Sequence, residues 1–211
     1  MRRLASRSCA QQVRSMATHD SFVGRESAAT LGWSDTCSSI GIAMSDVSRS
    51  IKEGIGFGLI AGIVFAIAQV IAAVIASVPA IFVFRMFASV LLGGPALATT
   101  PAPAAIGIGI IANLYLSAMF GLFYGIYNSA LTQPTRRSLA RQATIGALYG
   151  VMLWLMSSQV FARYRYPWLL ELPQVPQIFL HAVCYGLPLG LLYATAERHV
   201  VAIQQPYGHT R

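Results

Sequence analysis

The chain has 211 residues, of which 55% are hydrophobic and only 10% are charged, and its mean hydropathy is +0.59. An ordinary soluble domain carries about a quarter charged residues, so this composition excludes that class. The formal net charge of +8 would suit a nucleic-acid-binding protein, but Arg and Lys lie mainly at the N-terminus and between apolar stretches, as topology signals do. We therefore expect one membrane domain and no nucleic-acid partner.

Residues 1–50 are polar and contain no long apolar run. The first 16 residues hold four arginines and no acidic residue, a composition typical of a mitochondrial transit peptide. The alternatives are a disordered cytoplasmic tail, or a true start at Met16 or Met44 rather than at Met1. The sequence favours these alternatives, so we expect residues 1–50 to be a disordered or artefactual tail.

Four apolar stretches follow, each long enough to cross a hydrocarbon core of about 30 Å. The predicted spans are Gly54 to Val78, Ala104 to Leu131, Ala140 to Phe161, and a last one from beyond Pro176 to Ala196. Between the first two, Ala80 to Leu92 is apolar but too short to span, and Arg85 interrupts it. This segment is therefore expected to be an interfacial or re-entrant helix. The predicted fold is an all-α membrane bundle of four transmembrane helices over residues 51–198, followed by a polar C-terminal tail, 199–211.

Cationic residues flank the two sides of these spans unequally. One side has Arg49, Lys52, Arg136, Arg137, Arg141 and Arg198, and the other has Arg85, Arg163 and Arg165 with Glu171 beside them. Because cytoplasmic connections carry the excess of Lys and Arg, both termini are expected in the cytoplasm. A five-span alternative, in which Ala80 to Leu92 crosses, would leave Arg136 and Arg137 on the wrong side.

Each predicted span carries glycines four residues apart, which places them on one helix face. The sets are Gly54, Gly58 and Gly62; Gly121 and Gly125; Gly146 and Gly150; and Gly186 and Gly190. Such residues let helix backbones approach closely in lipid, as in a glycine zipper. With the predicted topology, every set lies in the cytoplasmic half of its span.

The glycine sets also indicate a weak internal repeat. A shift of 65 residues superimposes Gly121 and Gly125 on the last set, and a shift of 88 superimposes Gly58 and Gly62 on the third. Two related hairpins, one with an insertion, would produce this pattern, although glycine-rich membrane helices also match by chance.

Polar residues lie mostly in the opposite halves of the same spans. Gln69 and Ser157 each follow a glycine of their span by seven residues, and Asn113 and Ser117 extend the stripe of the second set. The candidate polar pocket comprises Gln69, Arg85, Asn113, Ser117, Ser157, Gln177 and His181. Because polar groups in lipid need partners, these residues form either an outward-opening pocket or interhelical hydrogen bonds that hold the bundle together.

His181 is the only histidine inside a predicted span, and an intramembrane ionisable residue is a functional candidate, here as a haem or metal ligand, a proton relay or a hydrogen-bonding group for a substrate. A haem with two histidine ligands needs a second such residue, and His181 with Cys184 offers too few ligands for zinc. We therefore expect no metal and no cofactor, and a neutral, hydrogen-bonded histidine. Pro188 should disturb the helix near Cys184. We expect Arg85 to snorkel to the interface; the alternatives are that it pairs with Glu171 or binds an anionic headgroup or substrate.

The run from Pro79 through Arg85-Met86-Phe87-Ala88-Ser89 to Gly93, set between glycine-bearing spans, resembles small uncharacterised multi-span proteins of bacterial inner membranes. The resemblance covers about residues 50–198 and implies a bacterial inner-membrane setting without a known activity. A mitochondrial inner membrane is the alternative if residues 1–16 are a transit peptide.

No catalytic motif is present, and no span contains Asp or Glu between its ends, which argues against a carboxylate-driven proton or cation transporter. The sequence favours a non-catalytic accessory or self-associating structural component, whose partners are the lipid bilayer and either itself or a larger membrane complex, including a membrane redox complex. The alternative is a small-solute or lipid-binding, transporter-like protein that uses the outer pocket.

Overall fold

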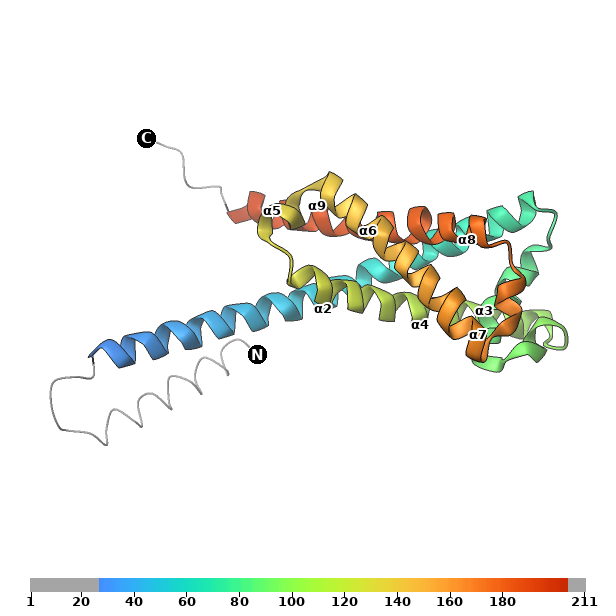
Figure 1. The fold of residues 1–211 in the computed structure, drawn as a ribbon, viewed down its shortest axis with the longest axis horizontal. Helices are drawn as coiled ribbons and strands as arrows, with labels where there is room; N and C mark the ends of the chain where they lie inside the picture. Colours follow the sequence, from blue (N-terminus) through green and yellow to red (C-terminus); the bar gives the residue numbers. More distant parts are fainter. Residues whose placement is uncertain (1–26, 205–211) are drawn as a thin grey trace, which may run out of the picture. The chain divides into compact units, whose positions relative to one another are not determined.

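Helices account for nearly all of the computed structural model, which describes residues 27–204 (Figure 1). In chain order the elements are α2 (Ser27–Ile75), α3 (Ala80–Leu92), η1 (Gly94–Leu97), α4 (Ala102–Ser129), α5 (Gln133–Arg137), α6 (Leu139–Trp154), η2 (Leu155–Phe161), α7 (Ala162–Arg165), η3 (Pro167–Glu171), α8 (Gln174–Phe179), η4 (Leu180–Gly186) and α9 (Leu187–Gln204). The elements η1 and η3 are 3₁₀ helices, whereas η2 and η4 are π-helical. No strand occurs between residues 27 and 204.

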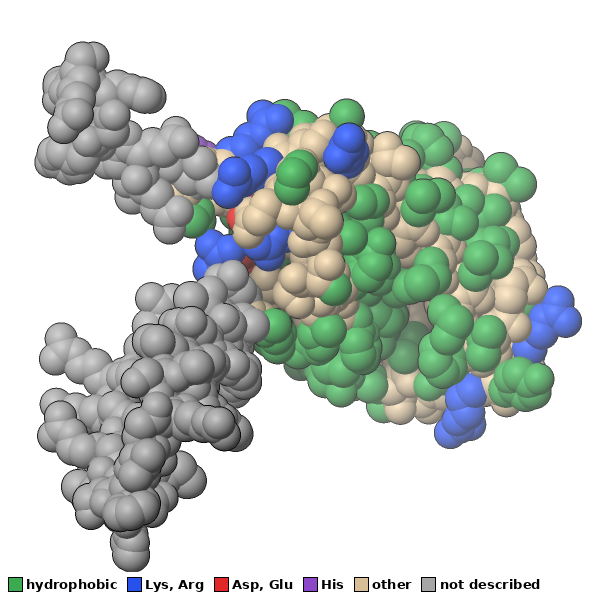
Figure 2. Space-filling model, turned by 60° about the vertical axis from the view of Figure 1, so that its left-hand side comes forward, with side chains coloured by type: hydrophobic (Ala, Val, Ile, Leu, Met, Phe, Trp, Pro, Cys, Tyr) green, Lys and Arg blue, Asp and Glu red, His purple; other side chains and the backbone are tan. Residues whose placement is uncertain are grey.

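Four stretches are long and apolar enough to cross a membrane, which confirms the predicted all-α fold with four helices of membrane-spanning length and composition. They are Val47–Ile75, Ala102–Ser129, Leu139–Arg165 and Gln174–Val200. Large apolar side chains remain exposed along them, for example Ile67 at 56% and Ile111 at 63%. Figure 2 shows apolar side chains over the middle of the visible face and Lys and Arg side chains toward its ends, the distribution expected of a bilayer-spanning bundle.

The chain divides into two units at Arg49 and Ser50, and the bundle described below belongs to the second. In the first unit the described residues are the helical turns of α2 from Ser27 onward, which include Met44. The predictions that concern Met1, Met16 and a transit peptide over residues 1–16 lie outside the described residues, as does much of the C-terminal tail.

Proline and glycine set the ends of several helices. Pro79, Pro101 and Pro173 each occupy the position just before a helix, at the start of α3, α4 and α8. Gly93 ends α3 with a positive φ of 83°, and its N–H bonds to the carbonyl of Ser89, an arrangement that glycine adopts without steric cost. Ser138 caps α6, since its hydroxyl accepts a hydrogen bond from the Arg141 N–H.

The short helix α3 packs along α4, at the end of the bundle away from α5 (Figure 1). Gly109 allows this contact, because a Cβ there would collide with the backbone of Phe84. Helix α3 is also tied to η3 and the residue before it: the Trp168 indole N–H donates to Ser89 Oγ at 2.9 Å, and the Tyr166 hydroxyl donates to the Val90 carbonyl at 3.2 Å. Helix α3 is thus a packed part of the bundle rather than a loose connection.

The nine glycines of the predicted sets lie at two helix contacts, and both contacts are within one chain. Between α2 and α4, a Cβ on Gly58 would meet the backbone of Gly121. Between α6 and the η4–α9 helix, a Cβ on Gly146 would meet the backbone of Gly186. The remaining glycines, Gly54, Gly62, Gly125, Gly150 and Gly190, face the same two contacts. The shift of 88 residues relates Gly58 to Gly146, and the shift of 65 relates Gly121 to Gly186. The Gly58–Gly121 contact of the first helix pair is therefore equivalent to the Gly146–Gly186 contact of the second.

Two π-helical segments interrupt the third and fourth spans. In η2, the hydroxyl of Ser157 bonds to the carbonyls of Leu153 and Trp154 at 2.8 and 3.1 Å, in competition with the backbone ladder. The other segment, η4, ends just before Pro188, which lacks an N–H and crowds the carbonyl four residues earlier, that of Cys184. Single π-helical turns of this kind occur often at functional sites, and both of these border the cavity described next.

Candidate functional site

A cavity of about 390 Å³ lies among all four spans and α3. Its wall includes six of the seven residues that the sequence assigned to a polar pocket, namely Gln69, Asn113, Ser117, Ser157, Gln177 and His181. They come from α2, α4, η2, α8 and η4, so five elements bring them together. Ser158 adds a further hydroxyl that the sequence did not single out.

Arg85 does not line this cavity. Its guanidinium donates hydrogen bonds to the carbonyls of Leu97, Ala98 and Thr100, at 2.8, 3.1 and 3.2 Å. These carbonyls belong to the end of η1 and the turn after it, where helical partners are missing. Arg85 therefore fastens the connection between α3 and α4, a role that differs from the snorkelling, ion-pairing and anion-binding roles considered from the sequence.

The side chains of Gln69, Asn113, Gln177 and His181 form one polar group, here termed the amide–imidazole cluster. The amides of Gln69 and Gln177 bond reciprocally, Gln69 Nε2 to Gln177 Oε1 at 2.8 Å and Gln177 Nε2 to Gln69 Oε1 at 3.2 Å. Asn113 Nδ2 donates to the Gly62 carbonyl at 3.1 Å. Each of these contacts ties α2 to a different helix, so the cluster holds the cavity wall together.

His181 has a defined orientation in this cluster. Its Nδ1 lies 2.8 Å from the Gln177 carbonyl, and because a carbonyl only accepts, Nδ1 carries the hydrogen. In the neutral imidazole Nε2 is then an acceptor, on the ring edge that points away from the η4 backbone. Phe65 packs edge-on against the ring with centroids 4.7 Å apart. Among residues 47–200, whose side chains are described, no group hydrogen-bonds to Nε2.

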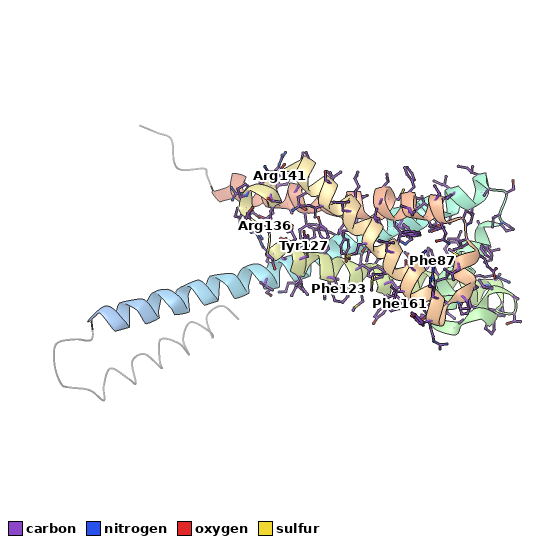
Figure 3. The ribbon with its side chains drawn as sticks, in the orientation of Figure 1. Phe87, Phe123, Tyr127, Arg136, Arg141 and Phe161 are labelled. Atoms are coloured by element: carbon purple, nitrogen blue, oxygen red, sulfur yellow. The ribbon has the colours of Figure 1, made fainter. Side chains whose placement is uncertain are left out.

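Aromatic and aliphatic side chains make up most of the remaining wall. Phe87 from α3, Phe123 from α4 and Phe161 from η2, which Figure 3 labels, contribute rings from three elements. Phe123 and Phe161 are exposed by 51% and 53%, as is Tyr115 by 59%. These exposed wall residues belong to α4 and η2, within two of the membrane-spanning stretches, and we take this exposed side of the wall as the opening of the cavity. We call this opening the lateral mouth.

A second polar group lies at the opposite end of the bundle and was not predicted. We call it the closed-end cluster, and it consists of Ser50, Tyr124, Asn128, Arg136, Gln142, Tyr193 and Glu197, all at most 3% exposed. Tyr124 donates to Gln142 at 2.7 Å, and Gln142 donates to Asn128 at 2.7 Å. The Tyr193 hydroxyl donates to the Ser50 carbonyl at 2.7 Å. These bonds join α2, α4, α6 and α9.

An ion pair belongs to the same end. Arg136 Nη1 of α5 lies 3.5 Å from Glu197 Oε1 of α9, and both side chains are buried. Figure 3 labels Arg136 near Arg141, at the end of the bundle opposite α3 and α7. The sequence alone indicates only a role in topology for Arg136, because its burial depends on α5 packing against α9.

The cavity wall contains no Asp, Glu, Lys or Arg, and the polar groups that it offers are amides, hydroxyls and one imidazole. Such a wall can hydrogen-bond a neutral molecule, and it carries no fixed charge to balance an ion. Comparisons with protein-family models, curated proteins and solved structures found no match to this chain.

Proposed function

We propose that this multi-pass membrane protein binds an amphipathic molecule of the bilayer in its intramembrane cavity. This is the lipid-binding, transporter-like alternative of the sequence analysis, and the observation that carries it is the lateral mouth. Exposed aromatic residues of α4 and η2 line the cavity within two of the stretches that are long and apolar enough to cross a membrane. A molecule dissolved in the bilayer would enter there without crossing water.

The size and composition of the cavity support the same proposal. A volume of about 390 Å³ falls within the range of about 300–1,000 Å³ that is usual for small-molecule sites. The wall is mainly apolar with a few convergent polar groups, the composition of a ligand site rather than of an ion pathway. The two π-helical segments, η2 and η4, add to this, because each contributes side chains to the wall.

The glycine contacts are relevant to the other function expected from the sequence, that of a non-catalytic accessory or self-associating structural component. Because the glycine sets pack against one another within one chain, we propose that they act as an internal glycine zipper that stabilises the fold. Self-association would then have to use other surfaces. The expected topology also remains part of the proposal: both termini in the cytoplasm of a bacterial inner membrane, with α3 an interfacial or re-entrant helix on the outer side.

Photolabelling tests the proposed binding. The protein is reconstituted in phosphatidylcholine vesicles with a monoacylglycerol whose chain carries a diazirine, and labelled residues are mapped by mass spectrometry. We expect labels on Phe65 and Leu153, which line the cavity and are only 8% and 6% exposed. Lipid outside the bundle does not reach these side chains.

A pair of tryptophan variants supplies the control. Met119 lines the cavity, so Met119→Trp should fill it and remove the labels on Phe65 and Leu153. Met152 is 46% exposed and lies outside the wall, so Met152→Trp should leave these labels unchanged. Labels confined to exposed residues in the wild-type protein would refute binding in the cavity.

A further inference from the structure

We infer that the amphipathic ligand has an uncharged head group with a hydroxyl, and that it binds with the hydroxyl at His181 and its chain in the lateral mouth. This inference rests on the proposed function and names the class of ligand. Long-chain alcohols, acylglycerols and hydroxyl-bearing isoprenoid lipids share this chemistry.

The absence of charge in the wall selects an uncharged head group. None of the cavity-lining residues is Asp, Glu, Lys or Arg, and Arg85 is engaged by three backbone carbonyls of the η1 connection. An anionic phosphate in this cavity would lose its hydration without gaining a cation. A neutral head group has only to replace hydrogen bonds to water, which amides and hydroxyls can do.

The hydrogen-bonding pattern selects a hydroxyl among uncharged groups. His181 Nδ1 is fixed as a donor to the Gln177 carbonyl, which leaves Nε2 as an acceptor beside Phe65. An acceptor of this kind requires a ligand donor. The reciprocal Gln69–Gln177 pair uses one N–H of each amide, so one N–H of each remains for an acceptor. A hydroxyl donates and accepts at once and therefore satisfies both.

The distribution of exposure orients the chain of the ligand. Gln69 is 4% exposed, whereas Tyr115 and Phe161 at the mouth are exposed by more than half. Asn113 is 7% exposed, and Gln177 and His181 are partly buried, so the polar groups are less exposed than the aromatic rings at the mouth. A molecule that placed its hydroxyl at the amide–imidazole cluster would keep its chain against the rings and extend it toward the lipid.

Three photolabels with the same diazirine-bearing chain test the head group: a long-chain alcohol, its methyl ether and its phosphate monoester. The measured quantity is the concentration that gives half-maximal labelling of Phe65 and Leu153 in reconstituted full-length protein. We expect the ether to require about three- to tenfold more than the alcohol, the effect of one hydrogen bond, and the phosphate to require more still.

His181 variants assign the difference to the imidazole. His181→Phe should abolish the preference for alcohol over ether, His181→Gln should retain part of it, and His199→Phe, at an exposed histidine outside the cavity, should leave it unchanged. The ratio is taken within each variant, so a general loss of cavity labelling does not imitate the effect.

The outcomes separate this inference from the proposed function. Equal labelling by alcohol and ether, or a preference that survives His181→Phe, would refute the hydroxyl site while binding in the cavity stands. Tightest labelling by the phosphate would also refute it and indicate an anionic ligand. No labelling of Phe65 and Leu153 by any of the three would refute binding itself, and the inference with it.

Discussion

The two ends of this bundle use the same side-chain chemistry to different effect. At the closed end, amides and hydroxyls bond to one another across helices and all are at most 3% exposed. At the cavity end, the amide–imidazole cluster makes comparable bonds but borders an open volume of about 390 Å³. The difference is one of packing, because the polar side chains of the closed end are buried against one another, whereas those of the other end line an open volume.

Along each of two spans, the residue type on the inward face changes from glycine at the closed end to polar side chains at the cavity end. On α4, the glycine contact around Gly121 and Gly125 gives way to Ser117 and Asn113, whose side chains occupy space between the helices. On α6 and η2, Gly146 and Gly150 give way to Ser157 in the same manner. Such an arrangement suits a binding site, since the glycine contacts hold the helices whose polar side chains form the cavity wall.

The largest expected effect comes from filling a glycine contact at the tight end. Gly121→Leu should prevent assembly, because even a Cβ there would collide with the backbone of Gly54 and Gly58. Gly121→Ala should destabilise by about 1–3 kcal/mol through overpacking. Thermal unfolding in detergent, followed by size-exclusion chromatography, measures both.

Gly107 provides the matched control on the same helix, because a Cβ there would meet nothing within 4 Å. Gly107→Ala should therefore be neutral or stabilising by up to about 1 kcal/mol, from helix propensity alone. If the two alanine variants behaved alike, the tight packing of α2 on α4 would be wrong.

The next effect concerns the buried ion pair of the closed end. Arg136→Leu should destabilise by about 3–5 kcal/mol, since it leaves the Glu197 carboxylate buried without this partner. Arg136→Leu combined with Glu197→Leu should be less harmful than the single change, because no buried charge of the pair then remains. Thermal unfolding of the single and double variants tests this, and simple additivity would show that the two residues do not interact.

A smaller effect is expected from Gln142→Met, which keeps the side-chain volume but removes the link between Tyr124 and Asn128. Both partners are fully buried, so each would lose a hydrogen bond that water cannot replace. We expect destabilisation by about 2–4 kcal/mol, the sum of two unsatisfied groups. Denaturation of the detergent-solubilised protein provides the measurement, and a loss below 1 kcal/mol would mean that water reaches the closed end.

The sequence predicted the helices and brought most cavity residues together for one physical reason. In lipid, a face of small and polar residues must point inward, so the stripe from Asn113 to Gly125 marks the interior side of α4. The spacing does not reveal how far apart two such faces lie, and it therefore left open whether Gln69 and His181 border a cavity or only bond across helices.

Other features depend on tertiary contacts that carry no sequence pattern. Arg85 bonds to backbone carbonyls of an irregular connection, and any residue type supplies these. Arg136 stands in a basic turn that reads as a topology signal, and only the fold places it against Glu197. Pro188 predicted a distortion of the helix near Cys184, where η4 lies. No proline predicts η2, where the Ser157 hydroxyl competes with backbone N–H groups for a carbonyl.

The smallest expected effect is the counterpart of the Gln142 change at the cavity end. Gln69→Met removes the reciprocal amide pair and leaves Gln177 without its partner, a chemical loss similar to that at Gln142. Here, however, Gln177 borders the cavity, so water or a bound head group can take the vacated positions. We expect destabilisation of about 1 kcal/mol or less, measured beside Gln142→Met under the same conditions. Equal losses in the two variants would mean that the cavity end is as dry and closed as the other, which would contradict the difference between the two ends.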